Sequence, residues 1–239
     1  MAIAIGLILA VLPSVLLLRY FIRRDRFPEP RGAILKTFGW GVGSPVPAVA
    51  LAGLLLFALV SSPADEVDNA WLRAAGVAFF GAAIPEELFK FAVLYFYCRR
   101  LGDFDEPMDG IVYGVIASLG FATLENILYV TQGGIGIAVI RAFTAVPGHA
   151  LLGAVMGFYF GMAHFLPRRR QRYLVLALLV PMLLHGLYNL PLLAPEQGAE
   201  PAWALAALGV LAAELVIARR LHGRLRAAQA PRAARASAT

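Results

Sequence analysis

Residues 109–130 read DGIVYGVIASLGFATLENILYV, and Asp109 and Glu125 are the only charged residues among them. A helix needs about 20 mostly apolar residues to cross the hydrocarbon core of a bilayer, which is roughly 30 Å thick. This stretch is therefore long enough and apolar enough to cross a membrane as one helix. Glu125 is unusual in it, because a charge at the centre of a bilayer costs about 2.5 to 3.5 kcal/mol even on the mildest scale.

The rest of the chain has the same character. Of its 239 residues, 60% are hydrophobic and 15% are charged, and the mean hydropathy is +0.72. A soluble domain carries about 25% charged and 45–50% apolar residues, so the composition excludes an ordinary soluble globule and a disordered chain. Cys98 is the only cysteine, which excludes a disulfide framework. We predict an all-α fold, a polytopic bundle of transmembrane helices.

The apolar segments predict about seven membrane spans. They cover residues 2–20, 38–60, 72–97, 109–130, 137–165, 173–194 and 202–218. We expect the fifth to be broken at Pro147-Gly148. The spans form a single transmembrane domain over residues 1–221, whose polar motifs fall within residues 70–195. Residues 222–239 are rich in Ala and Arg and are predicted to form a mobile cytoplasmic tail.

The basic residues gather in alternate loops. The segments after the first, third, fifth and seventh spans hold all 21 Lys and Arg residues except Arg73, Lys90 and Arg141. Cytoplasmic loops of membrane proteins carry such an excess, so we predict an outside N-terminus and a cytoplasmic C-terminus. The same pattern explains the net charge of +6 without a nucleic-acid partner, since no basic stripe interleaved with aromatic residues accompanies it.

The third span carries three charged residues, Glu86, Glu87 and Lys90, in the sequence IPEELFK. Helical residues three or four positions apart lie on one face, so either glutamate can pair with Lys90. A structural ion pair between helices would explain the lysine and one glutamate. It would leave the second glutamate unexplained, because adjacent residues point about 100° apart around a helix. We therefore favour a functional role for this cluster.

Polar motifs also occur on the next three spans. The fourth span carries Glu125-Asn126, the fifth carries His149, and the sixth carries His185 and Asn189. Each alone could be structural, for example an interhelical hydrogen bond worth about 0.6 kcal/mol in a membrane. Together with the third span they predict one shared site between mid-membrane and the outer half of the bilayer.

Two neighbouring features have simple structural explanations. Lys90 or Arg141 could neutralise Glu125. Small residues at four-residue spacing let another helix approach closely, and we expect only packing from the glycines that follow His149. These are Gly153, Gly157 and Gly161.

The polar residues suit metal-assisted peptide hydrolysis inside the membrane. Two histidines and a carboxylate are the usual ligands of a catalytic zinc ion with an open position. The expected ligands of a zinc ion are therefore Glu125, His149 and His185.

The other polar residues have expected catalytic roles. Glu86 would be the general base on water, although Glu87 is an equal candidate. Glu87 and Lys90 would orient the base or set its protonation, and Asn189 would stabilise the oxyanion.

Two other functions use the same residues. In a proton- or cation-coupled transporter or channel, the carboxylates would carry ions and Lys90 would be their switchable partner. The prolines in Ser44-Pro45-Val46-Pro47 and the Pro147-Gly148 pair would supply the broken helices of a transporter. In a non-catalytic membrane scaffold, substitutions of Glu86 and His185 would be tolerated.

The motifs Glu86-Glu87-x-x-Lys90, Phe121-x-x-x-Glu125-Asn126, His149 and His185-Gly-x-Tyr-Asn189 occur in this order on four consecutive predicted spans. In this they resemble the PrsW family of intramembrane metalloproteases, distant relatives of the CAAX prenyl proteases and of bacteriocin-processing membrane proteins. CAAX-type relatives have Arg and His where this chain has Lys90 and Glu125. The resemblance implies a bacterial cytoplasmic (inner) membrane protein. It also implies a membrane-anchored protein substrate, such as an anti-sigma factor cut on its extracytoplasmic side.

Overall fold

The structure is a computed structural model that describes residues 2–24, 26–60, 70–193 and 201–236, and these are folded as helices joined by short connections. This confirms the all-α prediction. The helices are α1 (Ala2–Arg24), α2 (Arg31–Gly43), α3 (Pro45–Val60), α4 (Ala70–Gly76), the π-helix η2 (Val77–Ala83), α5 (Ile84–Phe96), the 3-10 helix η3 (Cys98–Arg100), α6 (Pro107–Phe143), α7 (Ala145–Phe165), the 3-10 helix η4 (Pro167–Arg169), α8 (Arg170–Leu192) and α9 (Pro201–Ala236).

Helix α6 is not one straight rod. Gly134 has φ 71° and ψ −165°, a conformation that is essentially confined to glycine. Arg141 Nε donates a hydrogen bond to Asn126 Oδ1 at 2.8 Å, whereas residues fifteen apart in a continuous helix would be separated by about 22 Å. The chain therefore reverses at Gly134. The predicted fourth and fifth spans are the two legs of this hairpin, and α7 continues the second leg.

The two legs approach closely through glycines. An added Cβ would lie 2.3 Å from Gly157 O if built on Gly110, and 2.3 Å from Gly153 O if built on Gly114. Real Cβ atoms do not come this close to backbone atoms, so the seam requires residues without side chains. The glycine stripe on α7 thus packs as expected, and its partners are Gly110 and Gly114 of α6.

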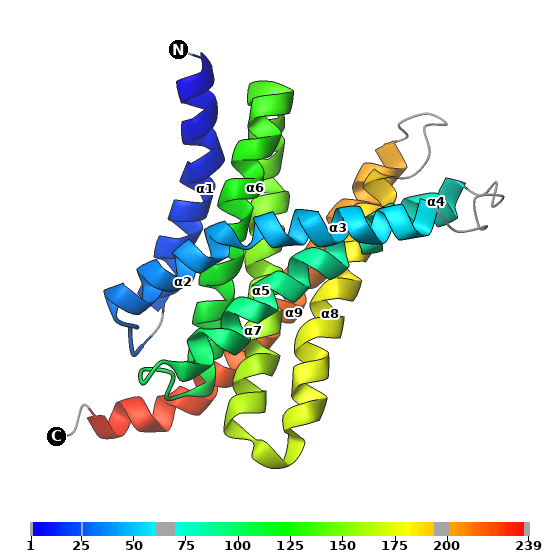
Figure 1. Cartoon of the computed structure of the whole chain (residues 1–239). Helices are drawn as coiled ribbons and strands as arrows, with labels where there is room; N and C mark the ends of the chain where they lie inside the picture. Colours follow the sequence, from blue (N-terminus) through cyan, green and yellow to red (C-terminus); the bar gives the residue numbers. More distant parts are fainter. Residues whose placement is uncertain (1, 25, 61–69, 194–200, 237–239) are drawn as a thin grey trace.

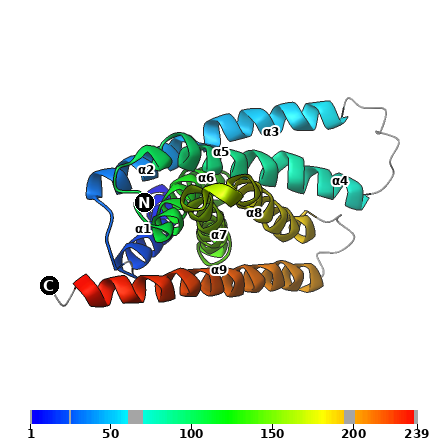
Figure 2. The same ribbon diagram turned by 90° about the horizontal axis from the view of Figure 1, so that it is seen from below.

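The α6–α7 hairpin is the centre of the molecule. Helices α1 and α2 pack against α6, and α8 packs against α7. Figure 2 shows α3 along one side of this centre and the long helix α9 along the opposite side. In Figure 1, α2 and α3 cross the direction of α6, and α5 runs beside α3. The hairpin is thereby enclosed, and most of its first leg is buried.

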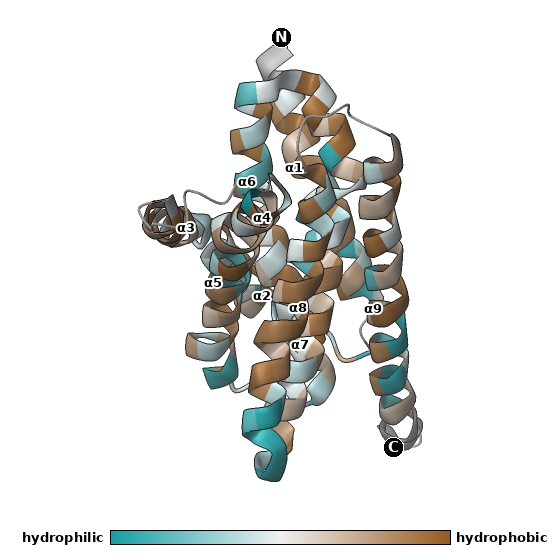
Figure 3. Cartoon of the chain, turned by 90° about the vertical axis from the view of Figure 1, so that its right-hand side faces the viewer, coloured by the Kyte–Doolittle hydropathy of each residue, from teal (hydrophilic) through white to brown (hydrophobic). Residues whose placement is uncertain are grey.

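The exterior is that of a membrane protein. Large apolar side chains face outward, among them Leu35 (71% exposed), Phe57 (72%) and Phe143 (77%). A soluble monomer rarely exposes contiguous apolar surface of this extent. Figure 3 shows polar residues gathered at the end that holds the turn between α7 and α8. In Figure 1, the end of α1, the α5–α6 connection and the C-terminus lie toward that same end.

Within the described residues, five segments are long and apolar enough to cross a membrane. They are Ile5–Arg23, Arg31–Leu59, Pro107–Phe165, Pro167–Leu192 and Ala202–Gln229. The 59-residue segment is the folded hairpin. The predicted third span is divided among α4, η2 and α5, and is not among the five segments. The count of seven spans and the orientation of the termini stay predictions.

Several boundaries differ from the sequence prediction. The break in the fifth span lies at Thr144, between α6 and α7, and Pro147 and Gly148 fall in the first turn of α7. A proline is tolerated in a first turn because its missing N–H would have no helical partner there. The second predicted span is divided at Ser44. Residues 222–236 of the predicted tail continue α9, and residues 237–239 lie outside the described part.

Candidate metal centre

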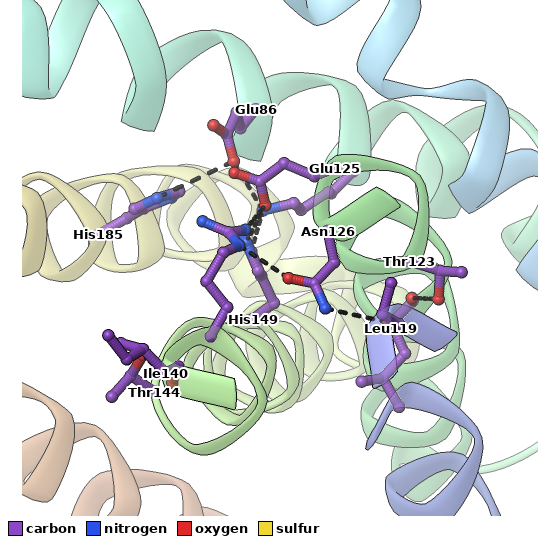
Figure 4. A network of polar contacts seen from close by, with 12 residues as sticks. Glu86, Leu119, Thr123, Glu125, Asn126, Ile140, Thr144, His149 and His185 are labelled. Atoms are coloured by element: carbon purple, nitrogen blue, oxygen red, sulfur yellow. Dashed lines mark hydrogen bonds and ion pairs between the residues drawn. The ribbon is translucent and has the colours of Figure 1, made fainter. Parts of the chain in front are cut away.

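The predicted polar residues come together from four helices around the α6–α7 hairpin. Helix α5 contributes Glu86, Glu87 and Lys90, α6 contributes Glu125, α7 contributes His149 and α8 contributes His185. Figure 4 shows Glu86, Glu125 and His149 converging, with His185 beside them. The site is therefore made by tertiary packing of segments that are far apart in the sequence.

The local structure before α5 is irregular. The π-helix η2 leads directly into α5, whose first turn contains Pro85, Glu86 and Glu87. A π-helical turn adds a residue to the helical repeat and occurs often at functional sites. On the facing helix α8, a Cβ on Gly186 would lie 2.2 Å from the Phe79 ring of η2. Gly186 therefore allows α8 to bring the adjacent His185 close to α5.

Lys90 is the cation at the centre of the cluster. Its Nζ lies 2.7 Å from Glu87 Oε1 and 3.5 Å from Glu86 Oε2. Glu87 and Lys90 are completely buried. The expectation that an ion pair with Lys90 would leave the second glutamate unexplained is wrong, because both glutamates lie within ion-pair distance of it. The ammonium also sits 4.3 Å from the centroid of the Phe121 ring, a cation–π contact that further fixes it.

Glu125 is held by two partners. Arg141 Nη2 lies 2.8 Å from Glu125 Oε2, and His149 Nε2 lies 2.7 Å from the same oxygen. Arg141 is one of the two neutralising partners that the sequence suggested. Asn126 accepts a hydrogen bond from Arg141 Nε and donates one to Ala10 O at 3.0 Å. Asn126 therefore positions Arg141, and it ties the site to α1.

The two histidines are held in different ways. His149 Nδ1 lies 2.8 Å from Lys90 Nζ. Because an ammonium can only donate, Nδ1 accepts and Nε2–H donates to Glu125. His185 Nδ1 bonds Glu87 Oε1 at 2.9 Å, and its Nε2 lies 3.9 Å from Glu86 Oε2. A carboxylate on Nδ1 that leaves Nε2 facing the site is the arrangement typical of metal-binding histidines.

In the part of the chain that the structure describes, two groups of donor atoms could hold a metal ion. They are Glu86, Glu125 and His149, and Glu86, Glu87 and His185, with the donor atoms of each group within 4.8 Å of one another. Glu86 Oε2 and Glu87 Oε2 are buried and have no hydrogen-bond partner among the described residues. Such oxygens have unused coordination capacity, and carboxylate and imidazole donors suit zinc. The predicted ligands Glu125, His149 and His185 do not form one group among the described residues, and each joins Glu86 instead.

Two cavities reach the cluster. One of about 510 Å³ is lined by Glu86, Glu125, His149, His185 and Asn189, together with residues of α9. A second, of about 400 Å³, lies against α3 and is also lined by Glu86 and Glu125. Glu87 and Lys90 line neither cavity. Glu86 is therefore the member of the glutamate pair that a substrate or a water molecule can reach.

The structure adds one residue that sequence reasoning missed. Glu214 of α9 lines the larger cavity and is 1% exposed. Neither of its carboxylate oxygens has a hydrogen-bond partner among the described residues. The signal was present in the sequence, because Glu214 is the only charged residue in the predicted span 202–218. A charge in such a segment is expensive and usually functional.

Sequence comparison identifies the chain. The profile of the PrsW family of intramembrane metalloproteases matches residues 29–218. The chain belongs to this family. Three PrsW proteases illustrate the similarity. They come from Geobacillus kaustophilus (43% identical over 189 residues, 78% of this chain and 79% of the relative), Bacillus subtilis (39% over 181 residues, 75% and 78%) and Clostridioides difficile (30% over 189 residues, 76% of each).

PrsW membership confirms the resemblance seen in the motifs. The protein is a hydrolase of the intramembrane metalloprotease type, and therefore acts with a metal on a membrane-associated protein. Its long apolar helices agree with a multi-pass membrane protein, and the three relatives are bacterial. No solved structure matches the chain.

Proposed function

We propose that this PrsW-family protease cleaves a peptide bond of a membrane-anchored protein with Glu86 as general base. One observation carries the proposal. Glu86 lines both cavities, and its carboxylate lies within 4.8 Å of the donor atoms of Glu125 and His149 and of those of Glu87 and His185. In this proposal Glu86 is not itself a ligand: it would stand beside an ion held by the other residues, and it remains reachable from the cavities.

We further propose that Glu125, His149 and His185 hold a zinc ion. The three belong to two donor groups that share Glu86, and the His149 and His185 rings lie 5.5 Å apart between centroids, so binding would require the two groups to draw together. When bound, such an ion acts as a Lewis acid that makes water easier to deprotonate and a carbonyl easier to attack. Glu87 orients His185 through Nδ1, as a carboxylate does for many metal-binding histidines. His149 shares its two ring nitrogens with Lys90 and Glu125, so ligation by His149 exchanges one of these bonds.

The structure favours Glu86 over Glu87 as the base. Glu87 is fully buried, and its Oε1 is occupied by Lys90 and His185. A base must lie within hydrogen-bond reach of the proton that it takes, and Glu87 faces neither cavity. Glu87 and Lys90 are therefore positioning residues in this proposal.

The proton then follows a short path. Glu86 takes a proton from water as the water oxygen attacks the scissile carbonyl carbon. The carboxylic acid returns this proton to the amine nitrogen as the C–N bond breaks. Asn189 lines the same cavity, and its side-chain amide would donate to the oxyanion that forms on the carbonyl oxygen.

We propose a membrane-anchored anti-sigma factor as the substrate and the bacterial cytoplasmic membrane as the location. The support is the family membership together with the predicted orientation, which puts the polar cluster between mid-membrane and the outer half. A cut there would fall on the extracytoplasmic side of the substrate's membrane helix. Co-expression with an anti-sigma factor tagged at both ends tests this, and only full-length substrate beside an active enzyme would refute it.

Metal stoichiometry is the first test of the site. Mass spectrometry of the purified full-length protein should find about one zinc ion per chain, lost in the variant His149→Ala/His185→Ala. The matched control is His164→Ala/His222→Ala, which removes the two histidines outside the cluster and should keep the metal. A folded wild-type protein without metal would instead favour proton or cation coupling through the carboxylates.

Two glutamine variants then separate the roles of the glutamates. Glu86→Gln should abolish cleavage of a membrane-anchored substrate while the zinc content stays near one. Glu87→Gln should lower both zinc content and cleavage, because a neutral amide oxygen is a weaker acceptor for His185 Nδ1–H and no longer balances the charge of Lys90. Normal cleavage by Glu86→Gln would exclude Glu86 as the base.

A further inference from the structure

A separate cavity lies at the end of the molecule that the charge pattern predicts to be cytoplasmic. It has a volume of about 400 Å³ and is lined by Tyr95, Arg99, Arg100, Phe160, Ala163, His164, Pro167, Arg170 and Leu174. These residues come from the end of α5, η3, the end of α7, η4 and the start of α8. None of them belongs to the candidate metal centre, so a ligand bound here is independent of the proposed function.

The cavity is strongly positive. Three arginines line it, and among the described residues no acidic side chain does. Within the described part of the chain, Arg99, Arg100 and Arg170 form no ion pair. Helix α8 begins at Arg170 without a side-chain cap and without an acidic residue in its first turn. The positive end of its dipole therefore adds to the field of the arginines.

The side chain of Arg99 has a fixed orientation and an unused hydrogen-bond donor. Its guanidinium stacks over the Tyr95 ring, 4.1 Å from the centroid. Its Nε is buried and has no hydrogen-bond partner among the described residues. A guanidinium in a fixed orientation, with an unused donor, matches the oxygens of a phosphate.

Apart from His164, the remaining lining is apolar. Phe160, Ala163, Pro167 and Leu174 form the other wall, and Phe160 packs edge-to-face on Phe91 and Phe104. A free phosphate ion gains nothing from such a wall. An amphiphile fits both parts of the cavity, because its phosphate can contact the arginines and its acyl chains can contact the apolar side chains.

We propose that this cavity binds the phosphate headgroup of an anionic phospholipid. Basic pockets between membrane helices on the cytoplasmic side bind such headgroups. Arg99, Arg100 and Arg170 contact the phosphate, and the apolar wall receives the start of an acyl chain. The lipid joins the ends of α5, α7 and α8, three helices that also carry residues of the metal centre.

Lipid titration of the full-length protein in detergent tests this proposal. The probes are phosphatidylglycerol, phosphatidylcholine and inorganic phosphate, and native mass spectrometry counts the bound molecules. Wild-type protein should retain one phosphatidylglycerol in preference to phosphatidylcholine. Arg99→Gln/Arg100→Gln/Arg170→Gln should bind it about a hundredfold more weakly, since each basic residue near an anionic lipid contributes about a fivefold factor.

The matched control removes the same charge elsewhere. Arg219→Gln/Arg220→Gln/Arg226→Gln changes three exposed arginines of α9 and should leave retention unchanged. Equal loss in the two triple variants, or equal binding of phosphatidylcholine, would overturn the proposal. Displacement of the lipid by millimolar inorganic phosphate would assign the cavity to a free anion instead. If the triple variant does not fold, Arg170→Gln alone, at an exposed position, should still weaken lipid retention, and unchanged retention would count against the site.

Discussion

At the scale of single residues, the site is a balance of buried charges. Glu86, Glu87 and Glu125 face Lys90 and Arg141 at ion-pair distances. Burying one charge is tolerable only when an opposite charge and hydrogen bonds accompany it. The glutamate pair therefore depends on Lys90, which also bonds His149.

Replacing Lys90 should be far more damaging than replacing the other lysine. Lys90→Ala leaves Glu86 and Glu87 without their cation, and breaking a buried pair in this way costs about 3 to 5 kcal/mol. Lys36 is exposed, so Lys36→Ala should change stability by less than about 0.5 kcal/mol. Thermal unfolding in detergent measures the difference. Equal melting temperatures for the two variants would mean that the carboxylates are neutralised by other groups.

Replacing Glu214 should stabilise the protein, whereas replacing Lys90 should destabilise it. Both of its oxygens lack hydrogen-bond partners among the described residues, so Glu214→Leu removes an unsatisfied buried group and should raise the melting temperature in detergent. Glu87→Leu is the contrasting variant. It removes the carboxylate that Lys90 and His185 both contact, and it should lower the melting temperature. A lower melting temperature for Glu214→Leu would show that its carboxylate stabilises the fold.

At the scale of elements, the α6–α7 hairpin decides where the site residues meet. Its reversal at Gly134 places Glu125 on one leg and His149 on the other leg's continuation, and the two are hydrogen-bonded. The legs can approach only because glycines face each other along the seam. Helix packing and the geometry of the site are therefore linked.

A side chain on the seam should separate these legs. In Gly157→Ala the new Cβ would lie 2.0 Å from Gly110 O, so α6 and α7 must move apart. Such overpacking typically costs about 1 to 3 kcal/mol. Gly209→Ala is the control, because a Cβ there meets nothing within 4 Å. Gly157→Ala should lower both melting temperature and metal content. If it matches the control, the seam is looser than the structure indicates.

At the scale of the whole molecule, charge is sorted along the axis of the bundle. Polar residues gather at the end with the α7–α8 turn, and apolar residues cover the middle (Figure 3). This end holds the proposed lipid cavity, and the positive-inside rule predicts that it faces the cytoplasm. The candidate metal centre lies away from it, among the α5, α6, α7 and α8 segments further along the bundle.

Cysteine labelling should verify this orientation. Burial raises the pKa of the Cys98 thiol to about 12, and a neutral buried thiol does not react with maleimides near neutral pH. The natural cysteine should therefore contribute no labelling signal. In intact cells, an impermeant maleimide should label Ala64→Cys, in a predicted outer loop, and should label Asp103→Cys only after lysis. The reverse pattern would invert the predicted topology.

The order of residues along the chain was enough to predict the all-α fold class, the membrane-spanning character and the polar residues that meet in the candidate metal centre. Hydrophobicity and segment length are local properties, so spans such as 109–130 can be recognised from composition alone. Charges inside those spans are costly, which is why Glu86, Glu87, Lys90, Glu125, His149 and His185 could be named in advance.

How these residues pair, and which of them face open space, became clear only in three dimensions. Lys90 contacts both glutamates and His149, Arg141 holds Glu125, and Glu86 alone of the glutamate pair lines the cavities. The place of Glu214 in the cavity lining and the position of the helix break at Thr144 also appeared only in the structure. The reason is that pairing and access depend on the relative placement of four helices. That placement is set by the glycine seam, the reversal at Gly134 and the π-helix before α5, which act between segments distant in the sequence.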